Sequence, residues 1–335
     1  MSDISIVDAP TTEQSAAQAA FLREFENMRS YLIRLAYHVL GVWQEAEDIV
    51  QDVAAGVWGM PDGMPVMTSA KAYCTKAVMN RAINRKKTMQ REIAASYWGV
   101  WLPEPDVCGI GELFESEQNT YSNIFSNTSS DTFSLEERSI SLGLLRMMET
   151  LTPTERAVYV LVELFGETHR EAAQTLAVQE TNARKLLERA RKKLEEGKKR
   201  FSASRDRHTA FFQAFATAAQ EGRYDALHSL LKEDVAMYSD GGGKVVASRI
   251  VIRGREKNIL ALKNIAAWAS KHEPSTWLPC GINGRVGAVA VHAATGNIIA
   301  ALTMEADEEG ITEMYSVRNP DKLRHLKTEM LLGSQ

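Results

Sequence analysis

Residues Gly166 to Arg200 read GETHREAAQTLAVQETNARKLLERARKKLEEGKKR, and this stretch predicts a short helix, a tight turn and a longer basic helix. In the longer helix, apolar residues recur at three- and four-residue steps, which predicts one buried stripe: Ala183, Leu186, Leu187, Ala190 and Leu194. The opposite face is polar: Thr181, Arg184, Lys185, Glu188 and Lys192, with Arg189 at its edge. In the short helix, Ala172, Ala173 and Leu176 form a small apolar face that lets two helices cross closely. This is the pattern of a helix-turn-helix unit.

A helix-turn-helix unit places its second helix in the major groove of DNA. There the N-terminal side chains reach base edges, and later Lys and Arg side chains meet phosphates. The same pattern also fits a helix pair whose basic face is merely solvated. The rest of the chain has to distinguish these two interpretations.

Basic charge is concentrated in two places along the chain. The formal net charge of −4 over 335 residues argues against a uniformly basic surface, so any DNA contact has to be local. One cluster is the longer helix already described. The other runs from Lys71 to Arg91 and contains no Asp or Glu. Because phosphate neutralisation supplies most of the affinity for DNA, two separated basic helices fit a protein that touches DNA at two places.

The cysteines and the N-terminal residues indicate the cellular compartment in which the protein acts. Cys74, Cys108 and Cys280 are far apart and lack a CxxC partner, which indicates reduced thiols rather than a disulfide framework or a zinc site. No apolar run approaches the length of a membrane span, and residues 1–19 have neither a basic flank nor a hydrophobic core for export. We therefore expect a cytoplasmic protein with no membrane partner, no metal and no cofactor, and a disordered segment over residues 1–19.

The N-terminal part of the chain predicts three helices. Ala20 to Leu40 and Trp43 to Trp58 carry apolar residues at helical spacing, and the basic segment from Lys71 to about Ile93 forms the third helix. The second helix presents an acidic stripe that includes Asp48, Gln51 and Asp52. Such a stripe fits either an ordinary soluble surface or a docking face.

A stiff connector follows the third helix. Residues 97–106 read YWGVWLPEPD, and three aromatic residues with two prolines predict a segment that lies in a groove. Val107 to Phe133 is rich in Ser, Asn and Thr, which predicts a linker. Leu135 to Thr150 then predicts a short helix, and TPTERAVYVLVELFG, which begins at Thr152, predicts the core helix of the domain that holds the helix-turn-helix.

After Arg207 the pattern changes to helices followed by strands, which predicts an α+β domain. The predicted helices are His208–Gln220, Tyr224–Leu231 and Glu256–Lys271. The predicted strands are Val235–Ser239, Val245–Ile252, Val286–His292, Ile298–Met304 and Ile311–Val317. A DGGGK turn (240–244) lies between the first two strands, and NPDKL (319–323) caps a terminal helix.

The order of these segments resembles an extracytoplasmic-function (ECF, group 4) bacterial RNA polymerase sigma factor. The resemblance rests on AEDIVQDVAAGVW, the basic helix, the polar linker and the stretch from LTPTERAVYVLVELFG to the end of the helix-turn-helix. The remainder resembles the SnoaL-like, NTF2-like extension of one ECF subgroup. WLPEP (101–105), DGGGK and NPDKL tie the chain to that subgroup. Two positions depart from the family: Asn84 stands where Asp is common, and YWGVWLPEP replaces the usual YVGPWLPEP.

The resemblance implies a multidomain fold with two all-α sigma domains and an α+β NTF2-like cone. It places the boundaries at residues 1–19 for the N-terminus, 20–96 for sigma region 2 and 97–134 for the linker with WLPEP. Sigma region 4, with the helix-turn-helix, takes 135–203. The SnoaL-like domain takes 204–335.

The family's functional residues can be carried onto this sequence by position. The surface that docks on the β′ clamp helices of core RNA polymerase corresponds to Asp48, Gln51 and Asp52. Contacts to the −10 promoter element correspond to Asn80, Arg81, Asn84, Arg85, Lys86 and Lys87. Contacts to the −35 element correspond to Glu180, Thr181, Arg184, Lys185 and Arg189. Regulatory motif residues are Trp101, Leu102, Pro103, Asp240, Gly241, Gly242, Gly243, Lys244, Asn319, Pro320, Asp321, Lys322 and Leu323.

SnoaL-like domains include cyclases and isomerases that use a buried carboxylate or His. Candidates here are Asp240, His292 and Glu313, but nothing in their spacing pairs them, so we expect no catalysis. DGGGK is better explained as a backbone feature, because its glycines permit positive φ and close approach of another segment. It fits either a hairpin turn or a contact with the sigma domains or the WLPEP linker.

The resemblance thus predicts a sigma factor that binds the β′ and β subunits of core RNA polymerase and promoter DNA. Its C-terminal domain would regulate it in the same polypeptide, so that a separate anti-sigma factor is not required. Two alternatives stay open: a one-component regulator with a ligand-binding SnoaL-like domain, and a SnoaL-type enzyme fused to a DNA tether. A simple operator-binding regulator needs neither the acidic stripe nor the second basic helix, so these features discriminate against it.

Overall fold

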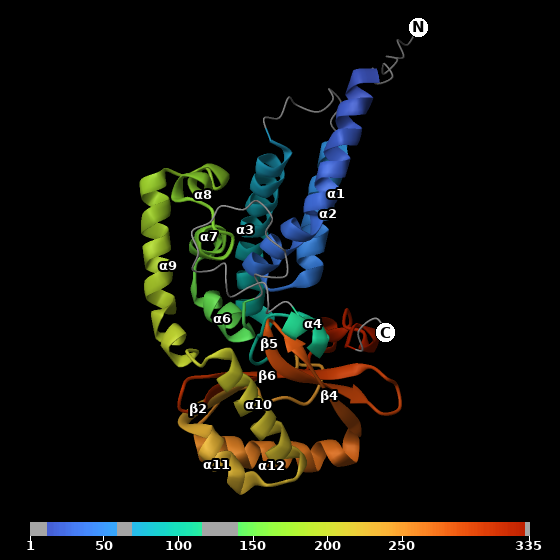
Figure 1. The fold of residues 1–335 in the computed structure, drawn as a ribbon, viewed down its shortest axis with the longest axis vertical. Helices are drawn as coiled ribbons and strands as arrows, with labels where there is room; N and C mark the ends of the chain where they lie inside the picture. Colours follow the sequence, from blue (N-terminus) through green and yellow to red (C-terminus); the bar gives the residue numbers. More distant parts are fainter. Residues whose placement is uncertain (1–11, 59–68, 116–139, 332–335) are drawn as a thin grey trace. The chain divides into compact units, whose positions relative to one another are not determined.

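The computed structural model describes residues 12–58, 69–115 and 140–331 (Figure 1). Three predicted segments lie partly outside the described residues. They are the N-terminal segment up to residue 11, the later part of the linker, and the start of the helix predicted at Leu135. The chain divides into two compact units: Met1–Thr88 with Pro153–Leu187, and Met89–Thr152 with Glu188–Gln335. The domain boundaries predicted from the sequence remain predictions, and each unit is described by itself below.

The described elements of the first unit are all helical. They are α1 (Thr12–Leu40), α2 (Trp43–Trp58), most of α3 (Ala70–Ser96), α7 (Pro153–Tyr159), the π-helical η3 (Val160–Leu164), α8 (His169–Thr175) and the start of α9 (Glu180–Arg200). The predicted apolar repeat of α1 is buried throughout, from Phe21 to Val39. Gly41, with a φ of 76°, then ends the helix. The sequence predicted disorder over residues 1–19 and a helix from Ala20, but α1 begins at Thr12, so the prediction of disorder was wrong for residues 12–19.

The helix-turn-helix forms as predicted. Thr168 caps α8, since its hydroxyl accepts the Glu171 N–H at 3.2 Å and the Glu171 carboxylate accepts the Thr168 N–H at 2.7 Å. Between α8 and α9, Ala177 takes a left-handed φ of 52°, which lets the chain reverse direction tightly. The predicted stripe of α9 is buried: Ala183, Leu186, Leu187, Ala190 and Leu194 are each at most 6% exposed.

The second unit is built on a mixed sheet of seven strands in the order β1-β4-β5-β6-β7-β2-β3. Its strands are β1 (Val107–Cys108), β2 (Leu231–Asp240), β3 (Ile252–Arg253), β4 (Ser275–Ile282), β5 (Arg285–His292), β6 (Ile298–Ala306) and β7 (Ile311–Val317). Only the β2–β7 pair is parallel within this sheet. Its helices are α4 (Ile110–Glu115), α6 (Leu142–Met147), η2 (Met148–Thr150), α10 (Arg205–Gln220), η4 (Tyr224–Ala226), α11 (Leu227–Leu230), α12 (Arg255–His272), α13 (Pro320–Leu323) and η5 (Thr328–Leu331).

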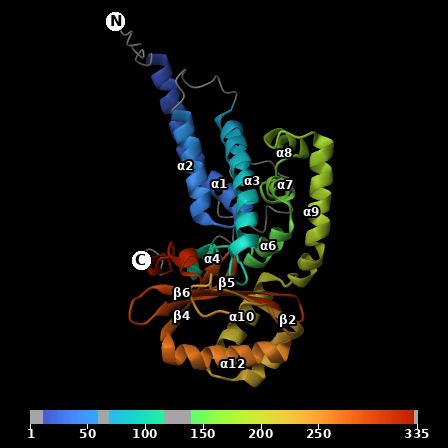
Figure 2. The ribbon, with the colours of Figure 1, turned by 180° about the vertical axis from the view of Figure 1, so that it is seen from behind.

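Both faces of the sheet are covered (Figures 1 and 2). On one face, Met237 of β2 packs in a cluster with Phe211, Phe212 and Phe215 of α10. The next residue, Tyr238, points to the opposite face and packs in a second cluster. That cluster includes residues from outside the predicted domain: Leu102, Val107 and Leu142. Because successive strand residues point to opposite faces, one strand serves two cores. The fold class predicted from the sequence, helical domains plus an α+β domain, is confirmed.

One predicted strand was wrong, and one strand was missed. The strand predicted at Val245–Ile252 is a loop that pairs with β2 only through Ile252 and Arg253. Its apolar residues do not enter a core, since Val246 is 62% and Ile250 73% exposed. Strand β4 was missed, because Pro279 interrupts a pattern that otherwise fits a strand, and proline disfavours strand interiors.

The predicted linker also contains structure. Among its described residues, Val107 and Cys108 pair with Ile282 and Gly281 of β4, and α4 follows. Polar composition predicted a loop, but Leu113 is buried in the core on the α10 face. A tertiary contact thus overrides the local composition.

Candidate functional site

Helix α9 presents the residues predicted to face the −35 element. Thr181, Arg184, Lys185 and Arg189 are exposed, and Glu180 is half-buried. Glu180 and Arg184 form an ion pair of 2.6 Å one turn apart, which orients the guanidinium along the helix. The buried stripe on the opposite side fixes which face is free. The N-terminal turns of α9 therefore offer hydroxyl, guanidinium and ammonium donors to a ligand outside the protein.

Helix α3 presents most of the residues predicted for the −10 element. Asn80, Arg81, Asn84 and Lys87 are exposed and follow one another at one-, three- and three-residue steps, so they share one side of the helix. Val78, Met79 and Ala82, all fully buried, fix that helix orientation. The geometry gives a strip of amides and cations suited to hydrogen bonding with bases and phosphates.

Two predicted −10 residues are engaged inside the protein. Lys86 is fully buried, and its ammonium donates to the Leu40 carbonyl at 2.9 Å, where α1 ends. Arg85 makes a two-point ion pair with Glu45, with distances of 2.5 and 2.6 Å. These contacts tie α3 to α1 and α2. We therefore remove Lys86 from the proposed DNA-contact set, and we assign Arg85 first to this packing.

Helix α2 exposes the three residues predicted to face polymerase: Asp48, Gln51 and Asp52. Asp48 also accepts a hydrogen bond from Gln44 at 3.0 Å. The buried side of the helix carries Ala46, Val50, Val53 and Val57. The helix thus has one apolar face in the core and one acidic face outside it.

The structure brings the three short motifs of the second unit together around one carboxylate. Asp240, the first residue of DGGGK, is fully buried. It accepts hydrogen bonds from the Leu102 N–H at 2.8 Å, the Tyr97 hydroxyl at 2.5 Å and the Lys322 ammonium at 2.7 Å. Leu102 belongs to WLPEP and Lys322 to NPDKL. We call this set, with Asn319, the linker network.

Lys322 is the cation of the linker network. Its ammonium also donates to the Leu102 carbonyl and lies 4.1 Å from the centre of the Trp101 ring. Burial lowers the pKa of Lys322, and the attraction of Asp240 offsets part of that effect. The linker backbone at Leu102 is therefore held through both its N–H and its carbonyl.

Asn319 of NPDKL lies very close to the glycines of DGGGK. Asn319 caps α13 by accepting the Asp321 N–H at 3.1 Å, and its amide donates to the Tyr97 hydroxyl at 3.0 Å. Gly242 has a φ of 59°, and a Cβ there would lie 2.3 Å from the Asn319 amide nitrogen. The expectation that DGGGK allows positive φ and close approach is confirmed at this residue.

The other motif residues lie around the linker network. Pro103 and Leu323 are buried, as is Gly241. Lys244 and Asp321 form an exposed ion pair of 2.5 Å that joins DGGGK to NPDKL. Gly243, with a φ of 72°, lies against Trp98, where an added Cβ would approach the Trp98 Cβ to 3.1 Å. Pro320 is the exposed first residue of α13.

Sequence reasoning missed two residues of the linker network's surroundings. Tyr97 was noted only as an aromatic residue of the connector, yet its hydroxyl bridges Asp240 and Asn319. Burial and the Asp240 charge raise the pKa of Tyr97, so its hydroxyl stays protonated and donates. Arg249 stacks its guanidinium 4.5 Å from the Trp98 ring centre. The aromatic density of residues 97–101 was the available signal.

A second set of buried charges holds α6 on the sheet. Glu305 is fully buried beside α6, and it bonds with the Ser141 side chain and the Gly143 N–H. Burial raises the pKa of Glu305 to about 7. Glu313 accepts from the Tyr315 hydroxyl and lies 3.7 Å from Arg146 of α6 and 3.8 Å from Arg200 at the end of α9. No sequence pattern linked these residues.

The three candidate catalytic residues do not form a catalytic group. Asp240 serves the linker network, Glu313 pairs with Tyr315 and the arginines, and His292 bonds with Thr295. Strand register places Asp240 beside Val317, four positions along β7 from Glu313. Over residues 12–58, 69–115 and 140–331, no cluster of three potential metal ligands occurs. In that same part of the chain, no helix has the length and apolarity of a membrane span.

Comparison with known proteins agrees with these assignments of helices. The model for Sigma-70 region 2 matches residues 25–92, and the model for Sigma-70 region 4 matches residues 141–194. The first match covers part of α1, all of α2 and α3 up to residue 92, and the second runs from α6 to residue 194 of α9. The exposed polar residues described above for both basic helices fall inside these matches.

Relatives from Mycobacterium tuberculosis match nearly the whole chain. The ECF RNA polymerase sigma factor SigJ is 26% identical over 310 residues, which cover 89% of this chain and 92% of that protein. A probable ECF RNA polymerase sigma factor, SigI, is 26% identical over 312 residues, covering 90% and 94%. The crystal structure of SigJ shares the fold with a TM-score of 0.66 and 23% identity, covering 90% of this chain and 98% of that one.

These relatives share the C-terminal extension as well as the helical part, because the matches run through both. The two regional models lie on the helices that carry the exposed polar faces. The chain therefore contains segments that match Sigma-70 regions 2 and 4, and over nearly its whole length it is similar to extracytoplasmic-function sigma factors of RNA polymerase.

Proposed function

We propose that this sigma factor contacts core RNA polymerase through α2, the −10 element through α3 and the −35 element through α9. Sigma factors bind core RNA polymerase and promoter DNA, and the assignment of those partners to individual faces is our inference. One observation carries it: the polar faces of α3 and α9 are exposed and lie within the regional sigma models. We expect the protein to act in the cytoplasm.

For the −35 element, we propose that the first turns of α9 enter the major groove. Thr181, Arg184 and Lys185 lie there and are exposed. An Arg can make a two-point contact with guanine, which is worth about 1–3 kcal/mol of discrimination. Arg189, one turn later, reaches a phosphate. Glu180 holds Arg184 in the free protein and releases it, or accepts from a cytosine amine, in the complex.

For the −10 element, we propose that Asn80, Arg81, Asn84 and Lys87 contact the DNA. Strand separation costs unstacking energy, which amides and cations on one helix side can offset by holding the extruded base and the backbone. Arg85 and Lys86 instead stabilise the position of α3, since Arg85 pairs with Glu45 and Lys86 donates to the Leu40 carbonyl. The acidic face of α2, with Asp48, Gln51 and Asp52, contacts the β′ clamp helices, and the β subunit is the second polymerase partner.

The C-terminal domain regulates this binding within the same chain. The support is the linker network, since the connector between α3 and the region 4 helices is held by Asp240 and Lys322 at its Leu102 backbone. A connector fixed in one place restricts the positions that the two DNA-binding helices can adopt. A separate anti-sigma factor is then not required, and the domain has no catalytic role. A one-component regulator is not favoured, because region 2 would have no function in it.

A run-off transcription assay with purified core RNA polymerase tests the proposal. The full chain yields a promoter-specific transcript from the promoter upstream of its own operon, and core polymerase alone does not. Changing Arg184 and Lys185 to Ala reduces that transcript at least tenfold. Changing the exposed Lys257 and Lys263 of α12 to Ala serves as the charge-matched control and leaves it unchanged. Equal loss in both variants contradicts the assignment to α9.

A further inference from the structure

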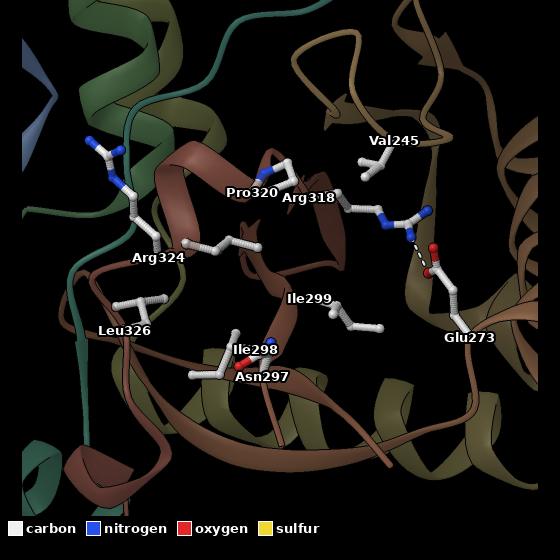
Figure 3. A pocket seen from close by; sticks show the side chains of 10 residues that line it. Val245, Glu273, Asn297, Ile298, Ile299, Arg318, Pro320, Arg324 and Leu326 are labelled. Carbon is white, nitrogen blue, oxygen red and sulfur yellow. Dashed lines mark hydrogen bonds and ion pairs between the residues drawn. The ribbon is translucent and has the colours of Figure 1, made fainter. Parts of the chain in front are cut away.

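A cavity of about 390 Å³ lies beside α13, at the edge of the linker network (Figure 3). Its walls come from the loop after DGGGK, the residue after α12, the start of β6, the residue after β7, and α13 with the residues that follow it. The lining residues are Val245, Glu273, Asn297, Ile298, Ile299, Arg318, Pro320, Leu323, Arg324 and Leu326. Its volume falls within the range of small-molecule sites, about 300–1,000 Å³.

The cavity is distinct from the space between the sheet and its long helices. Ile298, Leu323 and Leu326 belong to the apolar cluster on the linker side of the sheet. The other face is filled by Phe211, Phe212 and Phe215 of α10. A ligand in this cavity therefore contacts α13, not the α10 face.

Most of the cavity wall is apolar, and one arginine provides directional polar groups. Val245, Ile298, Ile299, Pro320, Leu323 and Leu326 supply the apolar part. The Arg318 side chain, 13% exposed, donates to the Val246 carbonyl at 2.5 Å and to Glu273. These are two of its five N–H groups. Among the described residues, the other three have no hydrogen-bond acceptor, so Arg318 can bind a further oxygen ligand.

The charged lining residues are Arg318, Arg324 and Glu273, and Glu273 is already paired with Arg318. Figure 3 shows Arg318 reaching across to Glu273, whereas the Arg324 guanidinium turns away from the other side chains. Arg318 is therefore the cation that faces a bound molecule. A carboxylate can accept charge-assisted hydrogen bonds from the remaining N–H groups of Arg318 while the pair with Glu273 stays intact.

We propose that this cavity is a binding site for a small apolar molecule with one carboxylate, such as a medium-chain fatty acid. The apolar body packs on Ile298, Ile299 and Leu326, and the carboxylate accepts from the free N–H groups of Arg318. The guanidinium remains bonded to Glu273, so the ligand adds to the ion pair instead of breaking it.

The site and the linker network share the short helix α13, so ligand binding can act on the linker network through this helix. Pro320 and Leu323 line the cavity, while Asn319 and Lys322 of the same short helix hold Tyr97 and Leu102. The binding proposal stands on the cavity itself and does not require the proposed promoter contacts. Its test is a direct binding measurement on the full chain.

Isothermal titration of the full chain with octanoate, and separately with uncharged octanamide, tests the proposal. We expect saturable 1:1 binding of octanoate with a Kd below about 1 mM, and at least tenfold weaker binding of octanamide. Arg318→Gln should weaken octanoate at least tenfold and leave octanamide unchanged. Ile299→Trp, which fills the cavity, should abolish both. Arg249→Gln, an arginine outside the lining, should bind as the unmodified protein does.

Three results overturn the proposal: no saturable octanoate binding, equal binding of octanoate and octanamide, or unchanged binding in Ile299→Trp. Melting curves of each variant accompany the titrations. If Arg318→Gln proves unfolded, because the loop carbonyl and Glu273 lose their donor, the Ile299→Trp and octanamide results decide the question.

Discussion

At the scale of single residues, the Asp240 carboxylate binds several groups of the second unit at once. It is fully buried and accepts from two backbone N–H groups, a phenol and an ammonium. Removing one partner of a buried ion pair leaves the other charge without compensation, which costs about 3–5 kcal/mol. The energetic role of Asp240 is thus to satisfy Lys322 and Leu102 together.

Asp240→Ala should lower the free energy of unfolding by about 3–5 kcal/mol, because Lys322 stays buried without its carboxylate. The double variant with Lys322→Met should cost less than the sum of the two single changes, since it removes both charges. Urea denaturation followed by tryptophan fluorescence measures this difference. Additive costs would show that the two side chains do not interact.

Gly242→Ala should be far more costly than Gly296→Ala. Both glycines have a left-handed φ, 59° and 70°, so each Ala pays about 1–2 kcal/mol of backbone strain. At Gly242 the new Cβ also meets Asn319, whereas at Gly296 nothing lies within 4 Å. The difference in melting temperature between the two variants isolates the contact with Asn319, and equal melting temperatures would argue against it.

Glu305 makes stability depend on pH. Its folded pKa of about 7 lies above its ordinary value of 4.5, so between these values the folded state binds more protons than the unfolded state. Stability from this group is therefore greatest at low pH and falls as pH rises towards 7, by up to about 1.4 kcal/mol per pH unit. Arg285 opposes the rise in pKa, and Glu313 adds to it.

Glu305→Gln removes that dependence. The stability of the variant minus that of the unmodified protein should increase from pH 5 to pH 7, as measured by urea denaturation at each pH. Taking the difference cancels His208, whose pKa burial lowers to about 4 and whose contribution has the opposite slope. Glu329→Gln, at an exposed position, is the control. A flat difference would place the Glu305 carboxyl in a more polar environment.

At the scale of elements, adjacent residues of α3 have different roles, because one is buried and stabilises the fold while the next is exposed. Lys86 bonds to the last carbonyl of α1, whereas Lys87 is exposed. The end of a helix leaves carbonyl groups without intrahelical donors, so the buried ammonium stabilises α1. Neighbouring lysines on one helix therefore have different roles.

Lys86→Met should lower the melting temperature of the protein, because the Leu40 carbonyl loses its donor. Lys87→Met should leave the melting temperature unchanged and instead weaken promoter DNA binding by the holoenzyme, with a shallower salt dependence. Thermal melts and filter binding at several salt concentrations measure the two effects. The opposite pattern would place Lys86, and not Lys87, at the DNA.

At the scale of the whole molecule, the C-terminal sheet organises segments that the sequence assigns to other parts. Leu102 of the connector, Val107 of β1 and Leu142 of α6 all lie in one apolar cluster with strand residues. Deleting residues 205–335 would expose these side chains and release the connector. The proposed regulation within one chain would therefore act through these shared core residues.

Releasing the connector in the full chain should change transcription. Lys322→Met removes the cation that holds Leu102, so we expect faster amide exchange at Leu102 and at least a threefold change in run-off transcript. Lys327→Met, at an exposed position of the same segment, should alter neither. A chain truncated after Ser204 should also differ from the unmodified protein in transcript yield. If both Lys322→Met and the truncated chain gave the same yield as the unmodified protein, regulation by this domain would be contradicted.

The sequence by itself determined the elements whose residues interact within a few positions. The spacing of Leu186 and Leu187 with Ala190 predicted α9 and its exposed polar face, and short apolar segments separated by turns predicted β5, β6 and β7. Such patterns are visible because a helix or strand buries one side at a fixed period. The glycines of DGGGK likewise predicted a close approach.

Only the tertiary structure decided what those elements meet. Leu102 and Asp240 are 138 residues apart, and Lys322 is 220 residues from Leu102. Nothing local distinguishes buried Lys86 from exposed Lys87, or the loop at Val246 from a strand. The physical reason is that burial and hydrogen-bond partners are set by the neighbours the folded chain supplies, so one residue pattern has different roles in different surroundings.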